Sequence, residues 1–444
     1  MVFPARFFKG FMMSGEKFER LLSLISESRL RSSTAGNRGL LIASESDKGR
    51  VINSASFRRL QQKAQVFPLE SNAAVRTRLT HSIEVSQVGR HLAQRVIENF
   101  GGSAVSYDRL AAFVNTVETA CLLHDIGNPP FGHLGESAVK EWFSNFQIKI
   151  PDLMGFDGNP QGFRLMSFLA GADNYGFNLT STLLLSTIKY PWDVAGRPEG
   201  KKIGIFSGDL DSYNQACETV GWTPGLKFPI VRLMDTADEI AYSMSDLEDG
   251  LEKMIISEDD LRSEFGAEHF QSGVIKPIVL FKTKVINQAV AEAAKNFTSN
   301  LDEILDGSEI KLINPSGEVG EILDRVNKFA RERIYSDESA ERVELAGRSV
   351  IKGLLSHFGE LINLSEEDFS VILRNDARAI RQKGLEFQAR LFRRLPKGYC
   401  EKYSVTSHGD ESHRRAHLVV DFISGMTDDF ALETYQVLEG IRIK

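Results

Sequence analysis

The amino-acid sequence predicts a mainly all-α protein. Apolar residues recur at helical spacing in several long stretches, glycines and prolines stand where those stretches end, and no internal repeat or glycine/serine linker interrupts them. Of the 444 residues, 42% are hydrophobic and 25% are charged, which is the composition of a folded globular chain. We therefore expect a helical bundle core with additional C-terminal helices and minor β elements.

The first two long helices are expected at 81–100 and 107–126. In both, apolar residues follow one another at intervals of three or four, which places them on one face. Gly101-Gly102 ends the first helix, and Gly127 with the two prolines that follow ends the second. The pair His124-Asp125 is therefore expected on the last turn of the second helix.

The rest of the chain is predicted to be helical with two extended stretches. Residues 150–225 are richer in glycine, proline and asparagine and predict loops over a helical base, with a strand at 202–207. Residues 399–422 are also expected to be extended. Helical periodicity predicts further helices at 230–254, 276–304, 318–334, 338–362, 366–394 (opened by a capping box of Ser365 and Asp368) and 425–440.

Composition also limits the partners and the compartment. The net charge of −7 gives no general case for coating a nucleic acid, so an anionic substrate would need a local group of cations. Cys121, Cys217 and Cys400 are odd in number and far apart, which favours reduced thiols in the cytoplasm. No stretch approaches the roughly 20 apolar residues of a membrane span, so we expect no membrane partner.

Four potential metal ligands are spread over three predicted helices. His81 opens one helix, His124 and Asp125 close the next, and Asp238 lies in the helix after residue 230. Two neutral imidazoles and two carboxylates suit a first-row divalent ion and leave room for water. Taken singly, a histidine at a helix end is more often a cap or a core residue. The joint pattern predicts a metal centre.

Four motifs extend this pattern: FRRLQQKAQVFP at 57–68, RTRLTHSIEVSQVGRHLA at 76–93, HDIGNPPFGHLGE at 124–136 and ADEIAYSMSDLEDG at 237–250. The order of a histidine, a later His-Asp doublet and a distant aspartate resembles the HD-domain superfamily of metal-dependent phosphohydrolases. The flanking residues resemble its deoxynucleoside triphosphate triphosphohydrolase branch, the dGTPase and dGTPase-like proteins.

This resemblance implies two domains. The first, residues 1–256, holds an N-terminal segment and the HD-domain core, with the motifs at 57–250. The second, residues 257–444, is a mainly helical region that packs on the core and takes part in oligomerisation. The boundary between them is soft and falls near 258–268.

The resemblance also assigns the metal ligands and a catalytic pair. It implies one divalent ion per subunit, Mn or Mg in use with Zn, Fe, Co or Ni as alternatives, held by His81, His124, Asp125 and Asp238. It assigns His133 and Glu136 to catalysis, and their spacing of three places them on one helix face. A carboxylate that orients an imidazole suits proton transfer near neutral pH. The alternative for Glu136 is a first-turn residue stabilised by the helix dipole.

A triphosphate brings about four negative charges, so cations must accompany the metal. Arg78, one helical turn before His81, is the best candidate from spacing alone. The resemblance implies that Lys189 and Tyr190 contact phosphate; the alternative is a solvated lysine beside a packing tyrosine. Asn128 stands where some relatives carry another histidine, so we place it with the substrate-binding residues and give it no proton-transfer role.

The sugar is expected to meet one face of the third helix. Tyr242 and Asp246 follow Asp238 at intervals of four and therefore share its face. The resemblance implies that Tyr242 packs against the deoxyribose and that Asp246 approaches the 3′-hydroxyl, which would disfavour an added 2′-hydroxyl. Either Gln61 or Gln62 is also expected to reach the sugar, and the sequence leaves that choice open.

The expected reaction is hydrolysis of dGTP or several deoxynucleoside triphosphates at the α-phosphorus, giving a deoxynucleoside and inorganic triphosphate. The family implies a homo-oligomer, such as a hexamer, and a nucleotide or single-stranded DNA effector. One alternative is another HD-type phosphohydrolase, a nucleotide monophosphatase or a phosphodiesterase. The other is a non-catalytic nucleotide- or DNA-sensing assembly protein, against which the intact pair His133 and Glu136 argues.

Two further groups of residues have functional and plain interpretations. Eight basic residues between Arg374 and Lys397 could contact an effector or a neighbouring subunit, but a solvated helix face is the more common explanation. His413 and His417, with His408 nearby, would suit a second metal if their segment were helical. Without a third ligand in register, we interpret them as surface residues.

Overall fold

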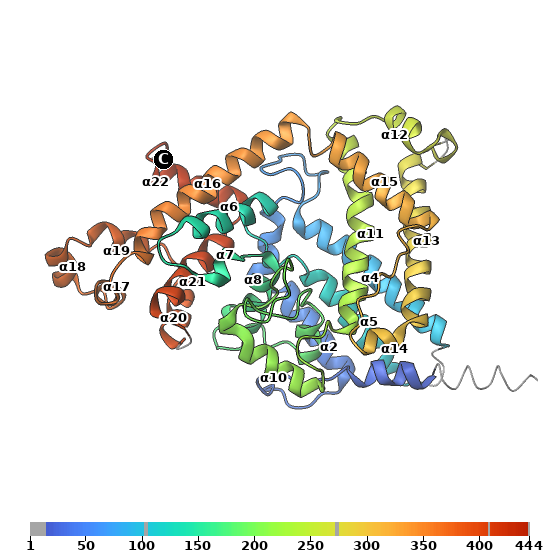
Figure 1. Ribbon diagram of the computed structural model, residues 1–444, viewed down its shortest axis with the longest axis horizontal. Coiled ribbons are helices and arrows are strands. Elements are labelled where there is room, and N and C mark those ends of the chain that lie inside the picture. Colours follow the sequence, from blue (N-terminus) through green and yellow to red (C-terminus); the bar gives the residue numbers. More distant parts are fainter. Residues whose placement is uncertain (1–14, 102–104, 271–274, 407–408, 443–444) are drawn as a thin grey trace, which may run out of the picture.

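The computed structural model describes residues 15–101, 105–270, 275–406 and 409–442, and almost all of its regular structure is helical (Figure 1). The all-α fold class is confirmed. The body is built from the long helices α2 (Leu40–Ile52), α4 (Arg78–Phe100), α5 (Tyr107–Leu123), α6 (Gly132–Asn145), α11 (Pro229–Glu252), α13 (Pro277–Ser299), α15 (Glu318–Arg333), α16 (Glu338–Ile362), α21 (Glu411–Ser424) and α22 (Asp428–Leu438).

Shorter elements connect these long helices: α3 (Ala55–Arg59), η1 (Leu60–Gln62), α7 (Pro151–Met154), α8 (Gly158–Arg164), the π-helical turn η2 (Leu165–Leu169), α9 (Ser181–Leu185), η3 (Ser207–Asp209), α10 (Leu210–Val220), α12 (Glu258–Phe265), η4 (Ala267–His269), α14 (Leu301–Leu305), α17 (Glu366–Leu373), α18 (Ala377–Lys383), α19 (Glu386–Phe392) and α20 (Lys397–Val405). Among the described helices, none is both long enough and apolar enough to span a bilayer.

A first hydrophobic cluster holds the N-terminal bundle together. Helix α4 packs against α5, α11 and α13, and α5 also packs against α2, so that α4 and α5 form the centre of this bundle. Buried residues such as Val85, Leu92, Val117 and Met244 fill it at the helical spacing seen in the sequence. The cluster continues through Ala289 and Leu323 to Ala340, so it draws on residues on both sides of position 256.

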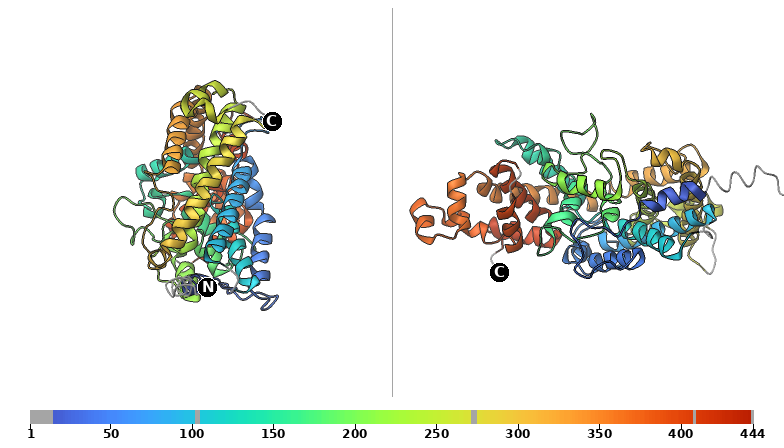
Figure 2. Two further views of the ribbon diagram at one scale, coloured as in Figure 1. Left: turned by 90° about the vertical axis from the view of Figure 1, so that its right-hand side faces the viewer. Right: turned by 90° about the horizontal axis from the view of Figure 1, so that it is seen from below.

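A second hydrophobic cluster lies beside the first. Helix α16 is its axis and contacts α6, α21 and α22, which come from distant parts of the chain (Figures 1 and 2). Phe143 of α6, Phe358 of α16 and Phe422 of α21 are among its buried residues. Because α6 begins beside the predicted catalytic histidine, the C-terminal helices form one wall under the predicted site.

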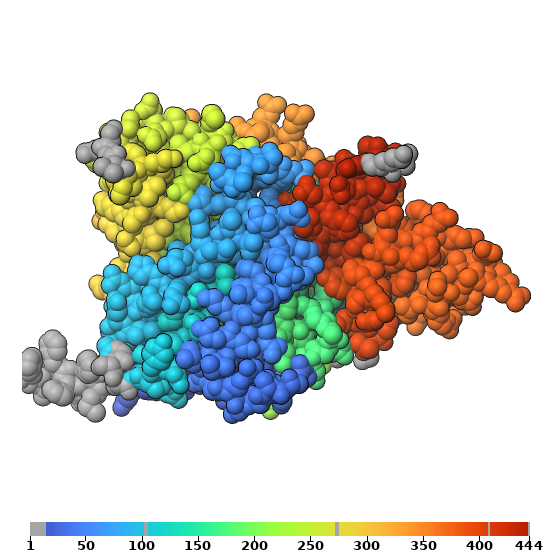
Figure 3. All heavy atoms as spheres, turned by 180° about the vertical axis from the view of Figure 1, so that it is seen from behind, coloured from blue at the N-terminus to red at the C-terminus, as the bar shows by residue number. Residues whose placement is uncertain are grey.

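Helices α17, α18 and α19 form a lobe that stands out from the body (Figures 1 and 3). The sequence predicts one helix over 366–394, but Asn375 and Gly384 adopt left-handed backbone conformations and break it into three. Ser365 caps α17 by accepting a hydrogen bond from the Asp368 N–H. The eight basic residues between Arg374 and Lys397 are all exposed on this lobe or just after it.

The strand predicted at 202–207 is wrong. The apolar residues Ile203, Ile205 and Phe206 are buried, but they insert between loops and helices and pair with no neighbouring strand. Gly204 instead lies against the backbone of Tyr190, where a Cβ atom would meet the carbonyl oxygen at 2.0 Å. Of the expected β elements, the described residues contain only two isolated bridges, Arg29 with Thr180 and Ala64 with Thr77.

The extended structure predicted at 399–422 is also wrong, because this segment forms α20 and most of α21. Ala416, Val419, Val420 and Ile423 are buried in the second cluster at a spacing of three and four residues. Packing of this face against α16 therefore outweighs the strand preference of the β-branched residues.

A backbone contact fixes the turn that follows the His-Asp pair. A Cβ atom on Gly127 would lie 2.1 Å from the Gly162 nitrogen and 2.2 Å from the Gly158 oxygen, so α8 can approach this turn only because residue 127 has no side chain. The contact places α8 directly beside the segment that carries His124 and Asp125.

We expect Gly127→Ala to lower the free energy of unfolding by at least about 1 kcal/mol, because the added methyl group overlaps backbone that cannot rotate away. Thermal unfolding measures the effect. Gly49→Ala is the matched control: it lies in α2 with nothing within 4 Å of the new Cβ, so the protein should gain up to about 1 kcal/mol. A Gly127→Ala protein as stable as wild type would refute the close contact.

Candidate active site

Three helices bring the four predicted metal ligands together. Helix α4 begins at Arg78 behind a capping box of Thr77 and Thr80, which places His81 in its first turn. Helix α5 ends at Leu123, one turn earlier than predicted, so His124 is its C-cap and Asp125 follows it. Ligand atoms of His81, His124 and Asp125 all lie within 4.8 Å of one another.

Asp238, near the middle of α11, completes the group. Its Oδ1 atom is 3.3 Å from Nε2 of His81 and 3.4 Å from Nε2 of His124. Both imidazoles are almost fully buried, and their rings meet edge to face with centroids 5.3 Å apart. The four side chains therefore surround one small volume, as a shared ion requires.

The hydrogen bonds around these ligands fit a divalent cation. Nδ1 of His124 is 2.7 Å from the Cys121 carbonyl oxygen, so that nitrogen carries the proton and Nε2 keeps its lone pair. Nε2 of His124 is buried and has no hydrogen-bond partner among the described residues. An unpartnered buried imidazole nitrogen beside two carboxylates is the donor set that Zn, Mn, Fe, Co or Ni takes. The residues present thus fit the expected ion.

Two cations neutralise the two carboxylates, whose side chains are 16% and 24% exposed. Arg78 forms an ion pair with Asp125, and Asn128 donates a 2.7 Å hydrogen bond to the other oxygen of that carboxylate. Burial raises the pKa of Asp125, but the Arg78 guanidinium outweighs it and holds the pKa well below its usual range. Burial also raises the pKa of Asp238, but Lys189, 3.0 Å away, outweighs it and lowers the pKa of that carboxyl.

The remaining predicted substrate-binding residues lie at different depths. Lys189 contacts both Asp238 and Asp235, whereas Tyr190 is half-buried with its ring near Trp192. Gln61 and Gln62 are exposed on η1. Asn128 is buried, and its contact with Asp125 directs it toward a metal ligand. The substrate roles of all five residues stay predictions.

The predicted catalytic pair is formed at the start of α6. Nδ1 of His133 is 3.3 Å from Oε2 of Glu136, while Oε1 of Glu136 accepts a 2.8 Å hydrogen bond from the Gly158 N–H of α8. Glu136 is buried, but the His133 side chain is 83% exposed. The hydrogen bond with Glu136 raises the pKa of His133. The imidazole of His133 thus faces solvent and is held by a buried carboxylate that is itself fixed.

Arg78 connects this pair to the metal-ligand cluster. A Cβ atom on Gly132, the residue before His133, would lie 2.9 Å from a terminal nitrogen of Arg78. The guanidinium therefore sits between Asp125 and the N-terminus of α6. The charges of both Arg78 and Asp125 act on His133, which places the two parts of the predicted site next to each other.

Tyr242 and Asp246 meet a third residue that the sequence did not indicate. The hydroxyl of Tyr335, in the turn after α15, is 2.5 Å from the Tyr242 hydroxyl and also hydrogen-bonds the Asp246 carboxyl. Because a hydroxyl has one hydrogen, Tyr335 donates to one of these groups and accepts from the other. In the part of the chain that the structure describes, the second carboxyl oxygen of Asp246 is buried without a hydrogen-bond partner. Burial and the nearby Asp249 raise the pKa of Asp246 to about 8, against the Tyr335 hydrogen bond.

Two more supporting residues were missed, and both link the site to the C-terminal region. Lys63 is buried and donates hydrogen bonds to the carbonyl oxygens of Asn128, at 2.5 Å, and Ser424, at 2.7 Å. Burial and the neighbouring Arg59 lower its pKa to about 7, against the pull of Asp428. Asp428 accepts 2.9 Å hydrogen bonds from the N–H groups of Phe131 and Ala64. The sequence offered one signal for Lys63, which is its place in the motif at 57–68. It offered no signal for Asp428, which lies outside all four motifs.

The second histidine group lies elsewhere. His413 and His417 are on α21, so the helical condition for a metal pair is met, but among the described residues no third ligand joins them. His417 instead lies 3.5 Å from Asp152. His408 is outside the described residues.

Comparison with known proteins agrees with this geometry. The HD domain family matches residues 78–151, and the phosphohydrolase-associated domain family matches residues 370–437. A probable deoxyguanosinetriphosphate triphosphohydrolase of Pseudomonas aeruginosa is 32% identical over 89% of this chain and 93% of its own length. The deoxyguanosinetriphosphate triphosphohydrolases of Klebsiella pneumoniae and Yersinia pseudotuberculosis are 31% and 30% identical over 91% and 96% of this chain, and over 95% and 99% of their own lengths.

The fold and these matches define an enzyme, a hydrolase of the HD-domain class. Within that class, the chain belongs to the deoxyguanosinetriphosphate triphosphohydrolase family, with similarity over nearly its whole length.

The raised pKa of Asp246 predicts a pH-dependent stability. Because its pKa is about 8 in the folded chain and 3.8 in its ordinary state, the folded protein keeps a proton that the unfolded chain releases, and stability falls as pH rises from about 4 to about 8. We therefore expect Asp246→Asn, which removes this titration, to raise the melting temperature relative to wild type more at pH 8 than at pH 5. Asp429→Asn, at an exposed position, should show no such difference. Equal gains at both pH values would contradict the assignment.

Proposed function

We propose that the chain hydrolyses dGTP or several deoxynucleoside triphosphates at the α-phosphorus in a metal-dependent reaction, releasing a deoxynucleoside and inorganic triphosphate. The observation that carries the proposal is the cluster of His81, His124, Asp125 and Asp238 beside the cations Arg78 and Lys189, with His133 and Glu136 next to it. The names of the relatives support the same substrate class.

The ion would be held by the two imidazoles and the two carboxylates, and we propose Mn or Mg as the ion in use. When bound, it supplies positive charge that polarises a phosphate and makes water a better nucleophile. Arg78 and Lys189 then bring the further charge that a triphosphate requires. Both lie at the cluster already, each paired with one of the ligating carboxylates.

His133 supplies the proton that the leaving group needs. Attack of water on the α-phosphorus breaks the bond to the 5′-oxygen, and that oxygen needs a proton as it leaves. His133 donates it, and the buried Glu136, fixed by the Gly158 N–H, holds the imidazole in place and stabilises its charged form. The attacking water loses one proton to the solvent as it bonds to phosphorus. His133, now neutral, takes up a proton from the solvent before the next turnover, which its exposed side chain allows.

The sugar would meet Tyr242 and Asp246. The Tyr242 ring lies 6.4 Å from the His81 ring, so a deoxyribose packed against this tyrosine is beside the metal-ligand cluster. The unpartnered oxygen of Asp246 is available for a sugar hydroxyl. Tyr335 fixes both side chains and is therefore a positioning residue for the sugar. We further propose a cytoplasmic homo-oligomer, such as a hexamer, with a nucleotide or single-stranded DNA effector.

Product analysis tests the reaction. The purified chain is incubated with each of the four deoxynucleoside triphosphates and Mn or Mg, and the products are separated by chromatography. We expect deoxynucleoside and triphosphate, loss of activity after chelation, and a fall in kcat of about 100-fold or more for His133→Ala. His91→Ala, ten residues after His81 on α4, is the control and should keep its activity. Orthophosphate or pyrophosphate as the first product would overturn the proposal.

The role of Glu136 predicts a shift in the pH profile. Because Glu136 raises the pKa of His133, Glu136→Gln should lower that pKa, and the protonated donor is then lost at lower pH. We therefore expect the alkaline limb of kcat to move to lower pH. Glu141→Gln, on the same helix but paired with Arg348 and Lys352, should leave the limb in place. An unchanged limb in Glu136→Gln would show that His133 is not the donor.

A further inference from the structure

The first turn of α6 carries His133 but lacks an ordinary helix cap. Its N-cap residue is Phe131, and a hydrocarbon ring cannot accept hydrogen bonds from the free N–H groups of a first turn. Phe131 and Gly132 are both left-handed, with φ angles of 59° and 56°, and only a glycine adopts this conformation readily. The Phe131 carbonyl oxygen accepts a hydrogen bond from the Gly135 N–H at 3.4 Å. This turn therefore needs support from elsewhere in the fold.

Asp428, the first residue of α22, supplies that support. The residue is 2% exposed, and its Oδ1 atom accepts a hydrogen bond from the Phe131 N–H at 2.9 Å. Its Oδ2 atom accepts a hydrogen bond from the Ala64 N–H, also at 2.9 Å. Both carboxylate oxygens are thus bonded to the backbone of distant segments, and one of them holds the residue at which α6 begins.

The ring of Phe131 is fixed as well as its backbone. Phe131 is 4% exposed and lies against α16 at Gly347, where an added Cβ atom would be 2.4 Å from the ring. Lys63 holds the earlier part of the same loop through its hydrogen bond to the Asn128 carbonyl oxygen. The backbone that leads into His133 is therefore held at both ends, and α16 and α22 of the C-terminal region hold its last residue.

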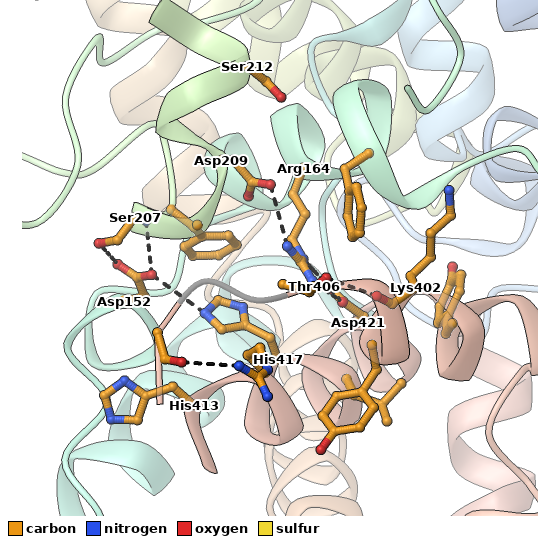
Figure 4. A pocket seen from close by; sticks show the side chains of 18 of the residues that line it. Asp152, Arg164, Ser207, Asp209, Ser212, Lys402, Thr406, His413, His417 and Asp421 are labelled. Atoms are coloured by element: carbon orange, nitrogen blue, oxygen red, sulfur yellow. Dashed lines mark hydrogen bonds and ion pairs between the residues drawn. The ribbon is translucent and has the colours of Figure 1, made fainter. Parts of the chain in front are cut away.

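Helix α8 is the common support of this arrangement. Asp421 of α21 accepts hydrogen bonds of 2.9 to 3.1 Å from Arg164 of α8 (Figure 4). Gln161 of α8 donates a further hydrogen bond of 2.9 Å to Asp421. The Gly158 N–H at the start of α8 holds Glu136. One helix thus fixes Glu136 directly and also anchors α21, which leads into the turn before α22.

Asp428 also has a plainer interpretation, as an acidic residue in the first turn of α22. The dipole of a helix favours negative charge at this end. Asp429 lies in the same turn, and its side chain is exposed. A dipole role would apply to both residues, but it does not require the burial of Asp428 or its hydrogen bond to Phe131. The contact with the loop before α6 therefore needs an explanation of its own.

We propose that Asp428 is a positioning residue for catalysis: by holding Phe131 in its left-handed conformation, it keeps the imidazole of His133 within reach of Glu136. Glu136 is fixed separately by the Gly158 N–H and stays in place when the first turn of α6 opens. Loss of the Asp428 carboxylate therefore separates His133 from Glu136, whose nearest side-chain atoms lie 3.3 Å apart. This inference rests on the proposed function, in which His133 donates a proton to the leaving group.

Steady-state kinetics of the full chain with dGTP and Mn tests the catalytic consequence. Asp428→Ala removes both acceptor oxygens. We expect kcat to fall about tenfold or more, because a misplaced proton donor slows the chemical step, while KM stays near the wild-type value, because Arg78 and Lys189 are untouched. Asp429→Ala, in the same turn, is the matched control and should keep the wild-type kcat. An unchanged kcat in Asp428→Ala, or an equal loss in Asp429→Ala, would overturn the proposal.

The pKa of His133 gives a second measurement, which requires no activity. Diethyl pyrocarbonate modifies the neutral imidazole, and peptide mass spectrometry follows this reaction at His133, whose side chain is 83% exposed. Because Glu136 raises the pKa of His133, we expect Asp428→Ala to be modified at lower pH than the wild-type chain. A profile equal to that of wild type would contradict the proposal. The other charged groups that act on His133 are unchanged in this variant: Arg78, Asp125 and Glu344.

A second pair of variants tests the same loop without changing the carboxylate. Gly347→Ala presses on the Phe131 ring, whereas Gly353→Ala, also on α16, places its methyl group 2.2 Å from the ring of Tyr435 in the second half of α22. We expect the first to lower kcat and to shift the modification profile to lower pH, and the second to do neither. Equal effects would overturn the proposal. If the wild-type chain hydrolyses no deoxynucleoside triphosphate, the proposed function fails, while the modification profiles still decide whether this loop positions His133.

Discussion

The burial of charged groups at the centre of the N-terminal bundle is the constraint on which the rest of the structure depends. Two buried imidazoles and two partly buried carboxylates meet among α4, α5 and α11, and an unpaired charge there would be costly. The structure places Arg78 on Asp125 and Lys189 on Asp238. The side chains that a phosphate would need are therefore present because the carboxylates require them in the folded chain.

The site also depends on the C-terminal region, although its predicted ligands all come from the first 250 residues. The loop between Asp125 and α6 is held by Lys63 and by the carboxylate of Asp428, and Lys63 reaches the end of α21 as well. Phe131, in this loop, has a left-handed backbone conformation that a phenylalanine rarely adopts. Asp428 accepts the hydrogen bond from the N–H of this residue, so the C-terminal helices stabilise the backbone conformation that leads into α6 and His133.

Periodicity and spacing predicted those features that depend on residues within a single helix. The bounds of α15 and α16 and the C-terminal end of α4 follow from their apolar faces and end signals, although α4 begins three residues earlier than predicted. The spacing of Asp238, Tyr242 and Asp246 placed the latter two on one face. Tyr335 could not be found in this way, because it reaches Asp246 across 89 positions and only packing brings them together. The predictions of extended structure at 202–207 and 399–422 were wrong for a related reason. Their apolar residues look alike in a strand and a buried helix, and the neighbours that decide between them are distant in sequence.

Helix α16 links the two hydrophobic clusters, which bears on how the protein unfolds. It is 25 residues, or about 37 Å, long. Its first turn contributes Ala340 to one hydrophobic cluster, while the stretch from Val350 to Ile362 is the axis of the other. Because α16 contributes buried residues to both clusters, unfolding of this helix would remove packing from both. The two clusters are thus linked by one continuous helix, and the predicted site, which is built on elements packed in both, depends on the packing of each.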